Sequence, residues 1–247
     1  MIAATFDFLR LFTMVVGFSL APPFQIRDVL KQIHFMANES VIIICFCVGS
    51  AAMVTIIESS FHMKLVIQND ALVPGFAAVL ILRELGSVVM ALLLASRVGA
   101  GIAAEVGSMQ VTEQIDALRM LGIDPVRFLV VPRFIACIVA GTLLAAIANL
   151  FCLYVAMLVS TWRLGYTSGA FLTAMRTFVG FEDLVFACLK GAAFGAVIPL
   201  FSCFFGFRCK AGAEGVGLAT THSVVSTSIA IIVIDFVLTY VFSHFQG

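Results

Sequence analysis

The sequence predicts an all-α integral membrane protein, with an amphipathic interfacial helix near the N-terminus followed by five transmembrane helices. The chain of 247 residues is 62% hydrophobic, and its mean hydropathy is +1.14. Only 11% of its residues are charged, compared with roughly 25% in soluble domains. Five apolar stretches are long enough to cross a bilayer, which requires ~20 residues. Lipid is therefore the expected solvent for most of the chain.

Composition and charge exclude several other classes of protein. A soluble domain of this length cannot bury so large a share of apolar side chains. Fourteen basic and fourteen acidic residues give a net charge of zero. The chain therefore lacks the basic surface that nucleic-acid binding requires, and we expect no nucleic-acid partner.

The N-terminal region, residues 1–39, is more polar than residues 40–247, which we expect to form the five-span domain. Apolar side chains recur at helical spacing over residues 22–37, and polar side chains take the other face. This pattern predicts a helix lying in the membrane interface; the alternative is a short soluble helix. Periodicity does not decide whether residues 1–20 extend this helix or enter the bilayer. Because Asp7 and Arg10 interrupt the first apolar stretch, we expect no cleaved signal peptide.

The second of the five expected spans is too long for one perpendicular crossing. Its glycines Gly86, Gly99 and Gly101 predict a bend or a close contact between helices. The expected spans are residues 40–61, 72–104, 128–160, 184–206 and 223–243.

Lys and Arg are distributed unequally between the two sides of this arrangement. With a cytoplasmic N-terminus, nine lie inside and three lie outside, while Arg83 and Lys190 fall within spans. Because cytoplasmic segments are the richer in Lys and Arg, we expect the N-terminus inside and the C-terminus outside. The inside residues are Arg10, Arg27, Lys31, Arg97, Arg119, Arg127, Arg133, Arg208 and Lys210; the outside residues are Lys64, Arg163 and Arg176.

A short helix is predicted over residues 112–121, in a polar connection on the cytoplasmic side. Thr112 is the expected N-cap, and Gly122 is the expected residue after the C-terminus. Ile115, Leu118 and Leu121 form one apolar side. Such a helix is suited to docking on a soluble partner; the alternative is an ordinary connecting loop. The side chains expected at that contact are Thr112, Glu113, Gln114, Asp116, Leu118 and Arg119.

Ionisable side chains within the spans are costly in lipid and usually face a cavity or each other. Arg83 and Glu84 are adjacent, so on a helix they point about 100° apart. Lys190 and Asp235 lie within later spans, and Glu58 lies near the end of the first. A polar chamber between helices accounts for these residues, and structural ion pairs between helices are the alternative. Ile56, Met63 and Ile67 share a helical face that is suited to an apolar pocket.

Familiar catalytic and cofactor motifs are absent from the sequence. It contains no GxxxxGK[ST] phosphate-binding loop and no GxSxG or HExxH motif. The four His are scattered, and the seven Cys form no CxxC pair. We therefore expect no catalytic residue, metal or cofactor in this chain.

Three stretches resemble the MlaE/YrbE-type permeases of MCE-associated ABC transporters. They are Leu82–Gly86, the long run Ala95–Arg133, and Gly212–Ser228 with the following Asp235–Thr239. The resemblance covers the chain from about residue 20 onward. It implies the MlaE permease fold in the bacterial inner membrane, with a cytoplasmic N-terminus and a periplasmic C-terminus.

The resemblance also implies partners and a cargo. The family works as a homodimer with two copies of a separate ABC ATPase, which binds the ATP and Mg²⁺. A periplasmic MCE-domain protein lies above it, and some members have a STAS-domain subunit. The implied function is transfer of phospholipid between the inner membrane and the MCE protein. The same class also carries sterols or fatty acids, and a proton-coupled secondary transporter using Glu58, Glu84 and Asp235 remains a further alternative.

Site residues follow from the resemblance position by position. Arg83, Glu84 and Lys190 match charged positions of the lipid cavity, and Ile56, Met63 and Ile67 fall near its apolar lining. Residues 112–121 match the coupling helix that contacts the ATPase. Ser87 stands where the family usually has proline, and we expect this change to straighten the helix locally.

Overall fold

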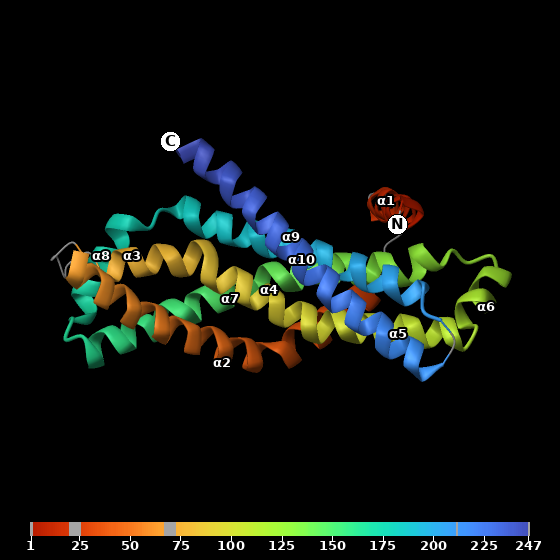
Figure 1. Ribbon diagram of the computed structural model, residues 1–247, viewed down its shortest axis with the longest axis horizontal. Helices are drawn as coiled ribbons and strands as arrows, with labels where there is room; N and C mark the ends of the chain where they lie inside the picture. The colour runs from red at the N-terminus through yellow and green to blue at the C-terminus, as the bar shows by residue number, and fades with distance from the viewer. Residues whose placement is uncertain (1, 20–25, 67–72, 211, 247) are drawn as a thin grey trace. The chain divides into compact units, whose positions relative to one another are not determined.

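The computed structural model describes residues 2–19, 26–66, 73–210 and 212–246 (Figure 1). Within these ranges the regular secondary structure is entirely helical and contains no strand, which confirms the predicted all-α class. Five helical stretches are long and apolar enough to cross a membrane. They are Val29–Met63, Val73–Val111, Val126–Arg163, Phe181–Phe207 and Ala213–His244.

The α-helices are labelled in Figure 1, and η denotes a π-helical segment. In chain order they are α1 (Ile2–Ser19), α2 (Ile26–Val66), α3 (Val73–Leu80), η2 (Ile81–Leu85), α4 (Gly86–Leu94), η3 (Ala95–Gly99), α5 (Ala100–Val111), α6 (Gln114–Met120), η4 (Val126–Val130), α7 (Val131–Arg163), α8 (Ser168–Phe178), α9 (Phe181–Phe207) and α10 (Ala213–Gln246).

The N-terminal region differs from the prediction. Residues 26–37 of the helix predicted over 22–37 are helical, but they are not a separate element, because α2 runs unbroken from Ile26 into the first span and ends at Val66. This helix contains no proline, and its first glycine is Gly49, so nothing in the sequence stops it where the amphipathic pattern ends. Residues 20–25 lie outside the described residues. The separate N-terminal helix is instead α1.

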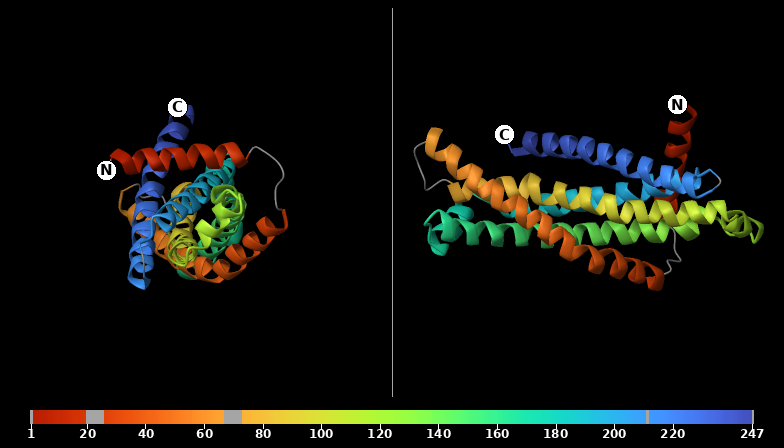
Figure 2. Two further views of the ribbon diagram at one scale, coloured as in Figure 1. Left: turned by 90° about the vertical axis from the view of Figure 1, so that its right-hand side faces the viewer. Right: turned by 60° about the horizontal axis from the view of Figure 1, so that its bottom comes forward.

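The first of two compact units combines Met1–Glu39, Leu92–Gly141 and Ala192–Ile234. Within it, α1 lies crosswise to its segments of α9 and α10 (Figure 2). Phe8 of α1 packs against Phe201 and Phe204 of α9, with ring centroids 4.6 and 5.4 Å apart. The core of this unit includes the fully buried Ala103, Val106, Cys137, Phe194 and Ile198.

The second unit combines Ser40–Ala91, Thr142–Gly191 and Asp235–Gly247. Phe178 of α8 fits against Gly75 of α3 at a spot where any Cβ would overlap its ring. The core includes the buried Ile44, Val48, Ala52, Met90 and Leu144. The division into 1–39 and 40–247 stays a prediction, since each unit is assembled from separated segments of the chain.

Two π-helical segments interrupt the second membrane-spanning stretch. A π segment inserts an extra residue and turns the following side chains, and such segments are frequent at functional sites. η2 contains Arg83 and Glu84 and ends directly before Gly86, where Asn149 Oδ1 occupies the place of a Cβ. Gly99 ends η3 and lies against Ser202 and Ile198. The predicted close contacts are therefore confirmed at Gly86 and Gly99, but not at Gly101, which faces open space.

Gly195→Ala should destabilise the protein by about 2–3 kcal/mol, in the range for overpacking. An added Cβ on Gly195 would lie 2.3 Å from the Cys137 carbonyl oxygen and 3.1 Å from the Ile138 Cα. These are backbone atoms, so α7 and α9 would have to separate. Thermal unfolding of the purified protein in detergent measures the effect.

The matched control is Gly101→Ala, a helical glycine whose Cβ would meet nothing within 4 Å. It should leave stability unchanged or raise it by up to about 1 kcal/mol, because Ala is the better helix former. Equal melting of the two variants would contradict the close packing of α7 on α9.

Candidate functional site

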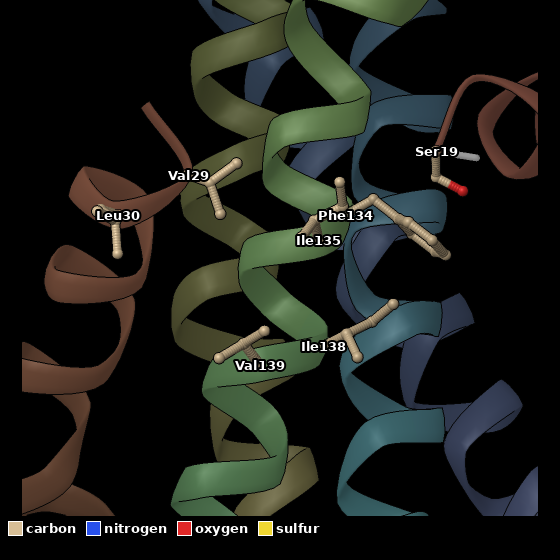
Figure 3. A pocket seen from close by; sticks show the side chains of 7 residues that line it. All are labelled: Ser19, Val29, Leu30, Phe134, Ile135, Ile138 and Val139. Carbon is tan, nitrogen blue, oxygen red and sulfur yellow. The ribbon is translucent and has the colours of Figure 1, made fainter. Parts of the chain in front are cut away.

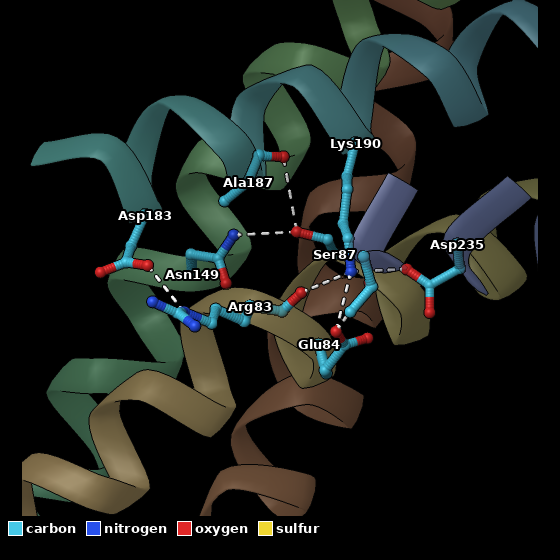
Figure 4. A network of polar contacts seen from close by, with 9 residues as sticks. Arg83, Glu84, Ser87, Asn149, Asp183, Ala187, Lys190 and Asp235 are labelled. Carbon is cyan, nitrogen blue, oxygen red and sulfur yellow. Dashed lines mark hydrogen bonds and ion pairs between the residues drawn. The ribbon is translucent and has the colours of Figure 1, made fainter. Parts of the chain in front are cut away.

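Five charged side chains meet inside the second unit, at the level of the membrane-spanning helices (Figure 4). η2 supplies two of them, α9 supplies two, and α10 supplies one. They are Arg83 and Glu84, Asp183 and Lys190, and Asp235.

Lys190 is the centre of this cluster, with a fully buried side chain. Its Nζ lies 2.6 Å from Asp235 Oδ1 and 3.1 Å from Glu84 Oε1. It also donates to the carbonyl oxygen of Arg83 at 2.7 Å. The ammonium charge thus meets two carboxylate oxygens and one backbone carbonyl oxygen. The buried charge is therefore compensated by atoms from η2 and α10.

Arg83 turns away from Glu84 toward a different acid. Its Nε donates to Asp183 Oδ1 at 2.7 Å, and the Asp183 side chain is only 3% exposed. The second oxygen of Asp183 accepts from the Gly180 backbone N–H at 2.9 Å. Asp183 was not predicted as a site residue. The available signal was its spacing of seven from Lys190, which places both on one face of α9.

The cluster contains an accessible part and a sealed part. The side chains of Glu84 and Arg83 are 40% and 32% exposed, whereas Lys190 is fully buried. Glu84 also accepts a hydrogen bond from the Thr239 hydroxyl at 3.0 Å. The site therefore presents one accessible cation, Arg83, and one accessible anion, Glu84. Each is paired with a buried group of α9.

Ser87 links the helix that follows η2 to two neighbours. Its hydroxyl donates to the Ala187 carbonyl at 3.5 Å and accepts from Asn149 Nδ2 at 3.3 Å. Ser87 lies in the regular α-helix α4, two residues after the end of the π segment η2, and the expected local straightening stays a prediction.

The apolar residues predicted beside the charges are less accessible than expected. Ile56 is fully buried, so it offers no surface to a ligand in this arrangement. Met63 is half-buried. Ile67 lies outside the described residues. Their role in a pocket stays a prediction.

The polar connection predicted as a helix over 112–121 contains the shorter helix α6, Gln114–Met120. Thr112 is not its N-cap: its hydroxyl donates to the Ser108 carbonyl at 2.8 Å and so completes α5. Glu113 takes the left-handed conformation, with φ 59°, and separates the two helices. Gly122, with φ 74°, ends the turn as predicted.

The surface of α6 combines charge with exposed apolar side chains. Glu113, Gln114, Asp116 and Arg119 are exposed, and Arg119 Nη1 donates to Asp116 Oδ1 at 2.8 Å. Ile115 is buried and Leu118 half-buried, but Met120 and Leu121 are 89% and 74% exposed. Leu121, predicted on the same apolar side as Ile115 and Leu118, is thus exposed beside Met120. The end of α6 presents two apolar side chains next to exposed charges.

Two apolar grooves lie in the first unit. One, with a volume of about 480 Å³, lies between the end of α1, the start of α2 and α7 (Figure 3). The other, of about 590 Å³, lies between α1, α9 and α10. Among the described residues, no charged side chain lines either groove, and each has a single serine among apolar side chains, Ser19 in the first and Ser226 in the second, so both fit hydrocarbon. The first is lined by Ser19, Val29, Leu30, Phe134, Ile135, Ile138 and Val139.

Comparison with known proteins decides the family. The family model described as Permease MlaE matches residues 29–241. The chain belongs to the MlaE permease family. It is 32% identical to a probable ABC transporter permease protein of Rickettsia typhi over 96% of this chain and 90% of that protein. A probable ABC transporter permease protein of Synechocystis is 36% identical over 90% of this chain and 83% of its own length.

A third relative is the intermembrane phospholipid transport system permease protein MlaE of Haemophilus influenzae. It is 31% identical over 92% of this chain and 88% of that protein. As an MlaE-family permease, this chain is a multi-pass subunit of an ABC transporter, and membership implies a partner ATPase.

Lys190→Met should destabilise this MlaE-family permease by about 3 kcal/mol. This value is at the lower end of the range for breaking a buried ion pair, because the Glu84 side chain is partly exposed. The change leaves the carboxylates of Glu84 and Asp235 together without their shared cation. Thermal unfolding in detergent measures the loss. Neutralising both carboxylates in the same chain, with Glu84→Gln and Asp235→Asn, should restore most of the stability.

Lys210→Met is the control, because Lys210 is an exposed lysine outside the cluster. It should melt like the wild type. If Lys190→Met also melts like the wild type, Lys190 does not hold the cluster together.

Proposed function

We propose that this permease moves phospholipid between the bacterial inner membrane and a periplasmic MCE-domain protein. The observation that carries the proposal is the mixed-charge cluster within the membrane-spanning helices, in which Arg83 and Glu84 remain accessible. Membrane-embedded charges of this kind commonly mark a substrate path. The name of the Haemophilus relative, a permease of an intermembrane phospholipid transport system, supports the same cargo.

The chemistry of a phospholipid fits the chemistry of the cluster. A guanidinium binds phosphate oxygens through charge-assisted hydrogen bonds, and Arg83 is the accessible cation. Acyl chains need no hydrogen bonds, so apolar side chains suffice for them. Ile56 and Met63 of α2, and Ile67, which lies outside the described residues, remain the residues we assign to that lining. The chain itself catalyses no reaction.

The proposed assembly is a homodimer with two ABC ATPase subunits on the cytoplasmic side and the MCE protein on the periplasmic side. The N-terminus then lies in the cytoplasm and the C-terminus in the periplasm, and some assemblies include a STAS-domain subunit. ATP and Mg²⁺ bind to the ATPase. The outer face of α10 supports a second copy, since it exposes Phe236, Val237 and Tyr240 by 50–70%.

We assign the ATPase contact to α6 and the residues beside it. Exposed charges from Glu113 to Arg119 surround an apolar tip, Met120 and Leu121. Apolar anchors with a charged rim are typical of protein interfaces. Closure of the ATPase dimer would push on this helix and change the shape of the cavity.

Other cargoes of the same transporter class are the main alternative. A fatty acid carboxylate also fits Arg83, whereas a sterol would leave the cluster without an anionic partner. A proton-coupled transporter is less well supported. Glu84 and Asp235 share the cation of Lys190, and Glu58 is an exposed residue of α2 outside the contacts of the cluster.

Arg83→Gln should lower phospholipid retention by roughly tenfold, the value of one charge-assisted hydrogen bond. The change also leaves Asp183 buried without its cation. The double variant Arg83→Gln with Asp183→Asn removes that second effect. Mass spectrometry of the lipid retained by the purified complex, with a transport assay between vesicles, measures both variants.

The double variant separates ligand binding from structure. If Arg83 binds phosphate, the double variant should recover thermal stability but not lipid retention. If thermal stability and lipid retention both recover, Arg83 serves only as the structural partner of Asp183 and does not bind phosphate. Retention of fatty acid or sterol in place of phospholipid would move the proposal to another cargo.

Asp116→Lys combined with Arg119→Glu should abolish co-purification of the ATPase or its stimulation by lipid. The swap keeps an ion pair of opposite sense within α6 but inverts the charges on its surface. Affinity purification from cells that co-express the ATPase measures the contact. Arg163→Glu, in a connection predicted on the other side of the membrane, is the control. Normal ATPase binding by the α6 variant would remove the assignment.

A further inference from the structure

The C-terminal part of α10 contacts the charged cluster through three different side chains. Asp235 pairs with Lys190, and the Thr239 hydroxyl donates to Glu84. The ring of Phe242 lies 5.4 Å from the guanidinium carbon of Arg83. Each charged side chain of η2, and the buried lysine of α9, therefore has its own partner on α10.

These three partners lie on one face of the helix. Positions 235, 239 and 242 are spaced i, i+4 and i+7, which confines them to an arc of about 60° at 100° per residue. Phe242 adds a second attachment, because it stacks on Phe186 of α9 with ring centroids 3.9 Å apart and planes 9° apart. The inner face of this segment is therefore matched to the site.

The opposite face of the segment is apolar and exposed, with Phe236, Val237, Tyr240 and Val241 each 45% exposed or more. Only 11% of the most apolar window of α10 is buried, compared with 50% in three of the other spans. An apolar outer face can shift against lipid, or against the apolar surface of the second copy proposed above, without exposing a polar group. The contacts of the inner face are thus the main attachment of this segment within its unit.

We propose that residues 235–242 of α10 form a gate over the charged site, with Asp235, Thr239 and Phe242 as positioning residues. The proposal rests on the phospholipid function proposed above. In the closed position the three side chains hold Lys190 and Glu84 and lie against Arg83, so that Arg83 and Glu84 are only partly exposed and Lys190 is sealed. Outward movement of the segment uncovers Lys190 and widens the access of a phosphate-bearing headgroup to Arg83 and Glu84.

Exchange of one anion for another makes this movement feasible. Opening removes the Asp235 carboxylate from the fully buried Lys190, and an uncompensated buried charge is costly. A headgroup phosphate that enters at the same time replaces the lost carboxylate. Because the ligand favours the open state, lipid binding and gate opening are linked.

Thr239→Val tests the gate with an almost isosteric change that removes only the hydroxyl donor to Glu84. The permease is placed in nanodiscs of phosphatidylethanolamine and phosphatidylglycerol, and amide hydrogen exchange is followed over residues 235–246. Both Thr239→Val and Phe242→Ala should speed this exchange roughly three- to tenfold, as expected for the loss of one favourable contact. Thr239→Ser keeps the hydroxyl and should restore slow exchange.

Thr221→Val is the matched control on the same helix. The Thr221 hydroxyl donates only within α10, to the Gly217 carbonyl at 3.0 Å. This variant should leave exchange over residues 235–246 at the wild-type rate. An equal effect of Thr221→Val would make the change a general property of α10 and overturn the gate.

The rate of lipid exchange distinguishes a gate from a purely structural role of these residues, because a structural role alone would not change that rate. Retained phospholipid should be replaced by deuterium-labelled phospholipid several-fold faster in Thr239→Val and Phe242→Ala. Unchanged lipid exchange with faster amide exchange would overturn the gate, and so would unchanged amide exchange. If Arg83→Gln still lowers lipid retention in those cases, the phospholipid function stands without the gate. If Arg83→Gln retains lipid normally, the proposed function itself fails.

Discussion

The buried ammonium group of Lys190 is the interaction on which the arrangement of the second unit depends. Three acceptor atoms, from Arg83, Glu84 and Asp235, surround it. A charge in the low-dielectric interior of a membrane protein persists only when it is compensated. The lysine therefore fixes the positions of η2 and α10 on α9, and a polar site can exist within spans that are otherwise apolar.

The π segment η2 determines how the two charges of the site are presented. Arg83 and Glu84 are adjacent in sequence, yet one reaches Asp183 and the other reaches Lys190 and Thr239. Both keep part of their surface open, while their partners on α9 are sealed. A ligand thus meets charges whose orientation is already set, which lowers the cost of ordering them when it binds.

Much of the fold could be predicted because its signals are local. The five apolar spans follow from composition and length, and the left-handed Gly122 follows from a glycine placed after a helix. The helix predicted over 22–37 is present from Ile26 but is not confined to that range, because the amphipathic pattern ends without any residue that stops a helix and α2 continues past it. The N-cap assigned to Thr112 was wrong, because the Thr112 hydroxyl donates to the Ser108 carbonyl of the preceding helix α5 and does not cap α6.

The site was predicted in part. Arg83, Glu84 and Lys190 were named from their cost in a membrane and from the family resemblance, and the structure brings them together. The partners Asp183, Thr239 and Phe242 were not predicted. They lie on other helices, and the spacing of residues along one helix does not show which other helices pack against it. The buried Ile56 shows the same limit, since periodicity identifies a face but not what covers it.

The backbone of Glu113 has a mechanical consequence for the connection between α5 and α6. A side-chain-bearing residue at φ 59° is held in a strained state of order 1 kcal/mol, and it persists because hydrogen bonds on both sides fix it. The Glu113 N–H donates to the Gln110 carbonyl, and its own carbonyl accepts from Ala117. The joint is therefore stiff, so a load applied to α6 is transmitted into α5 and is not dissipated as bending in the connection between them.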